Sequence, residues 1–190
     1  MSGLFAGLML QAAGWQVDIY EKVEGELSGR GAGIVAQPEI LAVLADLGLR
    51  ATELGVPVQK RRMFDATGRM TLETECPQVM TAWERVYRIL RDAFPPEHYH
   101  RGRSLRAFEQ DSQGVTAIFA NGMRENADLL IGADGIRSTL RALCAPGSDP
   151  LYAGYVAWRA LVAESAMSRD VHRDIFPYMA FCLPPGEQML

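Results

Sequence analysis

The residues with the clearest capacity for chemistry lie in segment 128–141, which reads Asp-Leu-Leu-Ile-Gly-Ala-Asp-Gly-Ile-Arg-Ser-Thr-Leu-Arg. Its apolar run predicts a buried strand, Gly-Ala-Asp-Gly a tight turn, and the remainder the first turns of a helix. Unpaired N–H groups and the positive end of a helix dipole meet at such a turn and favour an anion. Asp134 would repel phosphate, so its carboxylate is better suited to accepting hydrogen bonds from sugar-type hydroxyls. Taken alone, the segment is equally compatible with an ordinary strand-to-helix connection.

A second candidate site lies at the start of the chain. Residues 2–13 carry apolar side chains at helical spacing, and residues 16–21 alternate like a short strand that ends in Glu21. The spacing of Gly3, Gly7 and Glu21 matches the back half of a dinucleotide-binding βαβ unit. In such a unit, small residues let helix and strand pack closely, and the terminal acid accepts a ribose hydroxyl. The complete fingerprint also has a preceding strand and two further glycines, so we expect a chain truncated at its start.

Together, these two segments resemble the FAD-dependent aromatic-hydroxylase family, the single-component flavoprotein monooxygenases. Within that family, Arg-Gly-Ala-Gly-Ile-Val-Ala-Gln-Pro at 30–38 and Gly-Tyr-Val-Ala-Trp-Arg at 154–159 are most similar to the dihydroxypyridine-type hydroxylases. The resemblance implies an α/β fold, with a Rossmann-like FAD-binding domain of parallel sheet and β-meander, plus part of a β-sheet substrate domain. It extends along nearly all 190 residues but covers only the front of a family member, so a truncated end is expected too.

The resemblance also implies contacts to FAD. Asp134 would hold the ribityl chain, Glu21 the adenosine ribose and Arg30 another part of the cofactor, with Arg88 near the flavin and Leu105 by the adenine. The complete set of expected cofactor-binding residues is Ser2, Gly3, Glu21, Lys22, Arg30, Arg88, Leu105 and Asp134. We name no catalytic residue, because in such an enzyme the cofactor carries the difficult chemistry and the protein positions and shields it.

For Arg30 and Arg88, the amino-acid composition around them also allows an interpretation without a cofactor. The glycine-rich loop 27–34 around Arg30 is typical of a flexible surface loop. Arg85, Arg88 and Arg91 are spaced three apart, so they share roughly one helix face, and a solvated basic face is the usual reason for such a trio.

Four segments are expected along the chain, two in each domain type. They are 1–56, the first part of the FAD-binding domain; 57–76, a substrate-domain hairpin; 77–150, the second part of the FAD-binding domain; and 151–190, the truncated start of the substrate domain.

Turn and capping residues predict the elements inside these segments. In the first half we expect a helix from Pro38 to Gly48, a hairpin in 62–74, and a helix that a capping box at 81–84 opens and Pro95-Pro96 ends. In the second half we expect a meander over 104–131 with a tight turn at Asn121-Gly122, and a turn at Pro184-Pro185-Gly186. Between them, a strand is expected over 151–162, in which Tyr155 and Trp158 serve packing.

Composition favours an ordinary globular protein, with 48% hydrophobic and 22% charged residues. The net charge of −4 gives no electrostatic footprint for nucleic acid or an acidic membrane. No stretch has the length of a membrane span, and the apolar start lacks the positive region of a signal peptide, so a cytoplasmic protein is expected.

Metal chemistry is not expected. Cys76, Cys144 and Cys182 lie too far apart for a metal-ligand spacing, and we interpret them as thiols in a reducing compartment. His98 and His100 resemble a metal pair but have no obvious acid partner in the sequence, so surface histidines are the favoured interpretation.

The resemblance implies hydroxylation of a small aromatic or N-heteroaromatic ring, with NAD(P)H reducing FAD and O2 supplying the oxygen atom. The alternatives are another flavoprotein oxidoreductase of the same group (an epoxidase, halogenase or reductase) or an inactive truncated fragment. Hydrolase and P-loop functions are disfavoured because neither a Gly-x-Ser-x-Gly elbow nor a Gly-Lys-Ser/Thr loop occurs. The sequence carries no signal for substrate identity, for NADH over NADPH, or for oligomeric state.

Overall fold

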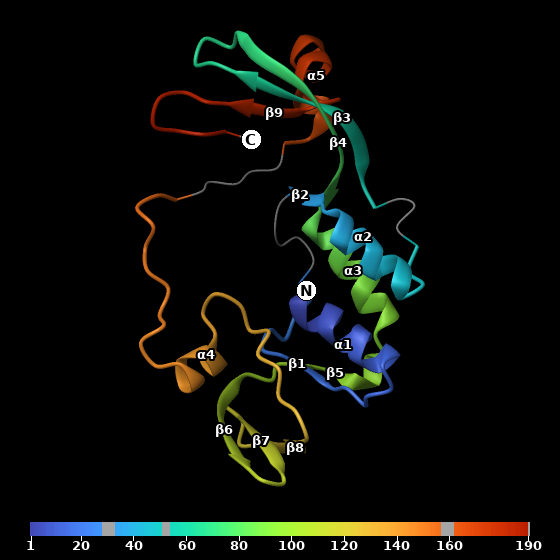
Figure 1. The fold of residues 1–190 in the computed structure, drawn as a ribbon, viewed down its shortest axis with the longest axis vertical. Helices are drawn as coiled ribbons and strands as arrows, with labels where there is room; N and C mark the ends of the chain where they lie inside the picture. The colour runs from blue at the N-terminus through green and yellow to red at the C-terminus, as the bar shows by residue number, and fades with distance from the viewer. Residues whose placement is uncertain (28–32, 51–53, 157–161, 190) are drawn as a thin grey trace. The chain divides into compact units, whose positions relative to one another are not determined.

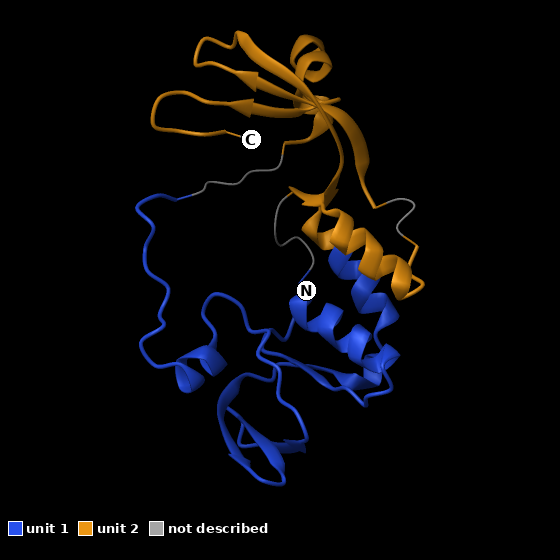
Figure 2. Ribbon diagram, viewed as in Figure 1, with its two compact units in different colours: residues 1–30, 86–157 blue, residues 31–85, 158–190 orange. Residues whose placement is uncertain are grey.

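The computed structural model describes residues 1–27, 33–50, 54–156 and 162–189. The chain divides into two compact units, each assembled from two separate stretches (Figure 2). Unit 1 comprises residues 1–30 and 86–157, and unit 2 comprises residues 31–85 and 158–190.

Unit 1 opens with a helix that packs on a parallel strand pair (Figure 1). Helix α1 (Ser2–Ala12) leads to β1 (Ile19–Glu21), which pairs in parallel with β5 (Tyr99–Arg101). A Cβ added to Gly7 would lie 2.9 Å from Ile19 Cδ1 and 3.0 Å from Phe94 Cε2. The predicted helix and its close packing are therefore confirmed, although the strand is shorter than the alternating pattern suggested.

Helix α3 (Trp83–Ala93) contributes its second part to unit 1 and buries one face completely. Val86 and Leu90 are fully buried and Tyr87 is nearly so, as is Phe94 directly after the helix. The helix ends just before Pro95-Pro96, as predicted, and a short 3-10 turn (Pro96–His98) leads into β5.

The predicted meander is confirmed as the second sheet of unit 1. It consists of β6 (Leu105–Asp111), β7 (Gly114–Phe119) and β8 (Arg124–Ala127), each antiparallel to the next. Alternate residues of β7 are buried, which is the period-two pattern of a strand with one covered face. The Asn121 side chain accepts a hydrogen bond from the Met123 N–H, and Gly122 takes φ +85° to complete the predicted turn.

The prediction of a buried strand just before Gly132 is wrong. Residues 128–131 form no strand, and Leu129 and Ile131 are 51% and 47% exposed. A strand needs a neighbour to satisfy its backbone N–H and C=O groups, and none of the described strands pairs with this segment. The turn and the helix after it are present, the helix being α4 (Thr139–Cys144).

Unit 2 is built on one four-stranded sheet in the order β2-β4-β3-β9. Its strands are β2 (Gly33–Ala36), β3 (Val56–Phe64), β4 (Met70–Ala82) and β9 (Met179–Cys182). Helices α2 (Pro38–Asp46) and α5 (Arg169–Ile175) and a 3-10 turn (Glu164–Ala166) complete the unit.

The hairpin of β3 and β4 confirms the predicted turn, in which Asp65 Oδ1 accepts hydrogen bonds from the N–H groups of Thr67 and Arg69. However, β4 continues without interruption from Cys76 through Pro77, where a domain boundary was expected. The expected division into FAD-binding and substrate segments stays a prediction. At the end of β4, the Thr81 hydroxyl of the expected capping box donates to the Leu54 carbonyl.

The predicted strand over 151–162 is wrong where the structure describes it. Residues 151–156 form no strand, and Leu151 and Tyr155 are 90% and 75% exposed, so Tyr155 does not serve packing. Its β-branched and aromatic residues favoured a strand, but that preference depends on a neighbouring surface to pack against. Trp158 lies outside the described residues. The predicted turn at Pro184-Pro185-Gly186 is present, with the Glu187 N–H donating to the Pro184 carbonyl.

None of the helices that the structure describes combines the length and the apolar character needed to cross a membrane.

Candidate functional site

The start of α1 lies directly against the Gly-Ala-Asp-Gly turn. A Cβ added to Gly3 would lie 3.4 Å from Ala133 Cβ, a normal contact distance. The first turn of α1 contains no acidic residue, and no side chain caps it. Its first N–H groups therefore have no intrahelical partner and point where the dipole favours an anion. This contact brings the predicted residues Ser2 and Gly3 to Asp134.

Asp134 is held by the helix that follows it. One carboxylate oxygen accepts from the Ser138 hydroxyl at 2.5 Å, and the other accepts from the Thr139 N–H at 2.6 Å and the Leu140 N–H at 3.2 Å. Partial burial alone would raise the pKa of Asp134, but these hydrogen bonds outweigh it and leave the pKa below its usual value. The carboxylate thus stabilises the start of α4 and stays ionised at neutral pH.

Glu21 stands at the carboxyl end of β1 with one oxygen engaged. The Val23 N–H donates to its Oε1 at 2.9 Å, while in the described part of the chain no hydrogen bond reaches Oε2. The backbone carbonyl of Glu21 accepts from the Arg103 N–H at 2.9 Å, which brings Leu105 to the same edge of unit 1. Lys22 follows directly and is exposed. A carboxylate with one unused oxygen can accept a ribose hydroxyl.

A cavity of about 530 Å³ opens beside this edge. Arg88 lines it together with Arg101, which is the register partner of Glu21 on the neighbouring parallel strand. Arg101 thus lies between Arg88 and Glu21, since it shares the cavity wall with Arg88 and the strand register with Glu21. The full lining is Glu26, Tyr87, Arg88, Arg91, Asp92, Phe94, Pro96 and Arg101.

Three arginines and two acids line this cavity. Arg101 is paired with Glu26 at 2.6 Å, and the Arg91 guanidinium lies 4.3 Å from the centre of the Tyr99 ring. Burial raises the pKa of Tyr99, and the neighbouring Tyr87 raises it further, so its phenol is neutral. The sequence missed Arg101 because its place beside Glu21 depends on the β1–β5 pairing, which no local pattern specifies.

Arg30 lies outside the described residues. The remaining predicted residues fall into two groups. The first group lies where the start of α1 meets the turn, and consists of Ser2, Gly3 and Asp134. The second group lies around the carboxyl ends of β1 and β5, and consists of Glu21, Lys22, Arg88 and Leu105. Both groups lie at the start of α1, because Gly3 meets Ala133 there and Glu21 interacts with the Met1 α-amino group, whose pKa is lowered by burial and raised in part by this carboxylate.

The two neighbouring histidines do have an acid partner, contrary to expectation. Asp18 Oδ1 lies 3.1 Å from His98 Nδ1 and 2.8 Å from His100 Nε2, and Tyr20 stacks on His100. Burial acts to raise the pKa of Asp18, but the two imidazoles outweigh it and lower the pKa. The contact could not be predicted from the sequence, because Asp18 lies 80 and 82 residues before the two histidines. Within the described ranges, no set of three or more His, Cys, Asp or Glu side chains is arranged to hold a metal ion.

Comparison with known proteins matches the chain to a family. Residues 1–170 match the family model described as an FAD binding domain. The 2,6-dihydroxypyridine 3-monooxygenase of Paenarthrobacter nicotinovorans is 38% identical over 172 residues, covering 90% of this chain and 43% of the relative. The FAD-dependent urate hydroxylase of Klebsiella pneumoniae subsp. pneumoniae is 31% identical over 176 residues, covering 85% of this chain and 45% of the relative.

A solved structure agrees in fold. The 2,6-dihydroxypyridine-3-hydroxylase from Arthrobacter nicotinovorans superimposes with a TM-score of 0.90 at 35% identity, covering 98% of this chain and 48% of that one. The chain thus spans less than half the length of these relatives. The predicted α/β architecture, with a parallel strand pair and a β-meander, is confirmed. On the extent of the family match and on this likeness, the chain belongs to the FAD binding domain family.

Proposed function

We propose that the chain is the FAD-binding part of a flavoprotein monooxygenase that hydroxylates a small aromatic or N-heteroaromatic ring with NAD(P)H and O2. The observation that carries this proposal is the arrangement around α1. The start of this helix lies against Ala133, the residue before Asp134, and Glu21 lies at the end of the strand that the helix packs on. An extended dinucleotide requires acceptors for sugar hydroxyls at separate points and donors for a pyrophosphate.

Each residue has a distinct task in this proposal. Glu21 accepts a ribose hydroxyl through the oxygen that Val23 leaves unused. The start of α1 receives the pyrophosphate, and the absence of a side chain at Gly3 lets Ala133 pack against this end of the helix. Arg88 and Arg101 line the cavity, where Glu26 balances the charge of Arg101. Bound FAD would supply the redox chemistry and the activation of O2, and these residues bind it, orient it and exclude water.

The first test is a titration of the chain with FAD, followed by the quenching of flavin fluorescence. We expect saturable noncovalent binding with one FAD for each chain, and a yellow protein after gel filtration. The hydroxylation itself is tested on a longer protein that contains this chain, by the mass of product formed from 2,6-dihydroxypyridine or 4-hydroxybenzoate with NADH and NADPH supplied separately. A chain that remains colourless and ignores FAD would contradict the proposal.

Substitution Glu21→Gln tests the ribose contact. The amide retains an acceptor but loses the charge, so FAD binding should weaken by about 1–2 kcal/mol while the melting temperature without FAD changes little. The control is Glu97→Gln, which removes a charge from the exposed 3-10 turn of the same unit and should leave FAD affinity unchanged. If Glu21→Gln lowers the melting temperature without affecting FAD, Glu21 has a structural role instead.

A further inference from the structure

The loop that follows β1 determines how Glu21 presents its carboxylate. Residues 22–26 (loop 22–26) form neither helix nor strand and lead to the buried Leu27. Within this loop, the Val23 N–H donates to Glu21 Oε1 at 2.9 Å. The position of that N–H therefore sets how the carboxylate is turned and which of its oxygens stays available.

The turn after β5 lies along this loop. The Arg103 N–H donates to the Glu21 carbonyl at 2.9 Å, and the Gly102 N–H donates to the Val23 carbonyl at 3.4 Å. The second distance is long for such a hydrogen bond, so it holds Val23 only weakly. A Cβ added to Gly102 would lie 3.8 Å from Glu24 Cβ and Cγ, an ordinary contact distance. Backbone contacts thus fix the start of the loop more firmly than its middle.

A long-range ion pair fastens the far end of loop 22–26. Arg101 Nη2 lies 2.6 Å from Glu26 Oε1, and the two residues are 75 positions apart in the sequence. The hydrogen bond to Glu26 raises the pKa of Arg101 above its ordinary value. The Arg101 side chain is 26% exposed and the Glu26 side chain 61%, so water screens the pair mainly at the glutamate.

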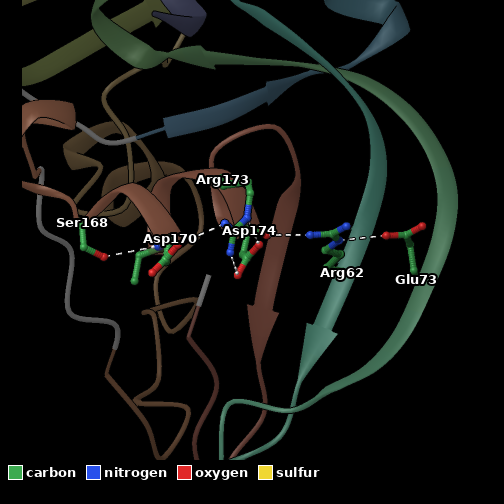
Figure 3. Close-up of polar contacts among 7 residues, drawn as sticks. Arg62, Glu73, Ser168, Asp170, Arg173 and Asp174 are labelled. Atoms are coloured by element: carbon green, nitrogen blue, oxygen red, sulfur yellow. Dashed lines mark hydrogen bonds and ion pairs between the residues drawn. The ribbon is translucent and has the colours of Figure 1, made fainter.

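The exposed ion pairs of α5 show what distinguishes this contact. Figure 3 shows Arg173 with Asp170 and Asp174 of the same helix, at 3.0 and 3.1 Å. Such pairs add little order, because the helix backbone already holds both partners. Glu26 belongs to a segment without helix or strand, so its pair with Arg101 restricts the path of the chain itself.

The Arg101 end of the pair is held by its own surroundings. Its backbone is in parallel register with Glu21 through the β1–β5 pairing. Its guanidinium lies 5.8 Å from the centre of the Tyr99 ring, and the Arg91 guanidinium lies 4.3 Å from the centre of the same ring. Tyr99 is buried and offers both cations a fixed aromatic surface. Arg101 therefore connects the strand pair to loop 22–26.

We propose that Arg101 is a positioning residue for Glu21. Through its ion pair with Glu26 it holds loop 22–26, so that Glu21 keeps Oε1 on the Val23 N–H and leaves Oε2 available for a ribose hydroxyl of FAD. This inference rests on the proposed function, because it assigns the loop to the FAD site. Arg101 acts through the loop and not by contact with the cofactor.

The first test needs no cofactor. The exchange of the Val23 amide proton with water is measured by NMR in the FAD-free chain and in Glu26→Gln, which removes the charge of the glutamate and leaves the core intact. We expect exchange to become at least about threefold faster, because the loop opens more often without the ion pair. An unchanged exchange rate would overturn the inference.

The second test is a double-mutant cycle on FAD affinity. Glu26→Gln and Arg101→Gln should each raise the Kd for FAD by about threefold to fivefold, and Arg101→Lys, which keeps the charge, should restore most of the affinity. In a Glu21→Ala background the Glu26→Gln change should have no further effect, because no carboxylate remains to be positioned. An equal loss in both backgrounds would overturn the role through Glu21, as would a Glu26→Gln protein with the parent affinity.

The matched control is Arg124→Gln, which breaks another arginine–glutamate pair of unit 1, between Arg124 and Glu109 of the meander. It should leave both the Val23 exchange rate and the Kd for FAD unchanged. The two measurements also separate this inference from the proposed function. A chain that binds no FAD removes the proposed function, while the Val23 exchange rate still decides whether the ion pair holds the loop. Normal FAD binding by Glu26→Gln and Arg101→Gln removes only the positioning role.

Discussion

Replacing Gly55 by alanine is expected to destabilise unit 2 by about 3 kcal/mol, the upper end of the range for overpacked sites. A Cβ at this position would overlap the carbonyl oxygen of Met80, and it would lie 2.8 Å from the carbonyl carbon and 3.0 Å from Thr81 Cα. These are backbone atoms of β4, so no side-chain rotation relieves the overlap. Because Val56 pairs with Met80 immediately afterwards, the hairpin would have to separate at this point.

The measurement is urea unfolding followed by circular dichroism, with Gly25→Ala as the control. A Cβ added to Gly25 has no atom within 4 Å, so that variant should lie within about 0.5 kcal/mol of the parent protein. If the two variants unfold at the same urea concentration, the close approach of Gly55 to β4 is wrong.

Asp134→Ala should have the second largest effect, because it removes the acceptor for three donors at once. The Ser138 hydroxyl and the N–H groups of Thr139 and Leu140 would lose their partner. We expect a loss of about 1–3 kcal/mol in FAD binding and a smaller loss of stability without FAD, since α4 is short and half-exposed. Comparison with Asp134→Asn, which keeps one oxygen acceptor, separates the charge from the hydrogen bonds.

The pH dependence of this contact follows from the lowered pKa of Asp134. A carboxyl group whose folded pKa lies below its unfolded value contributes its stability in full above the unfolded value, near pH 4, and loses it as the pH falls through the folded pKa. The difference between parent and Asp134→Ala should therefore be constant from pH 8 to about pH 5 and shrink below that. A difference that grows in acid would contradict the assignment.

Local patterns predicted most elements of the fold. Helix α1, helix α2 from Pro38, the β3–β4 turn and the meander all follow from apolar spacing and turn residues that act within a few positions. The two failures, at 128–131 and 151–156, are apolar runs that only a neighbouring strand or surface could order. A strand forms only when a second strand satisfies its backbone hydrogen bonds, and the sequence of one segment does not show whether that second strand is present.

The candidate site divides in the same way. Gly3, Glu21 and Asp134 could be selected from spacing, because the turn and the strand end that present them are local. Arg101 could not, since it becomes a neighbour of Glu21 only through the parallel pairing of β1 with β5.

The single carboxylate that His98 and His100 share joins segments that lie 80 and 82 residues apart in the chain. Asp18 directly precedes β1 and the two histidines lie at the start of β5, so the contact ties the beginnings of the two parallel strands together. Each strand is only three residues long and offers few backbone hydrogen bonds, so the shared carboxylate helps to hold the register of Ile19 with Tyr99.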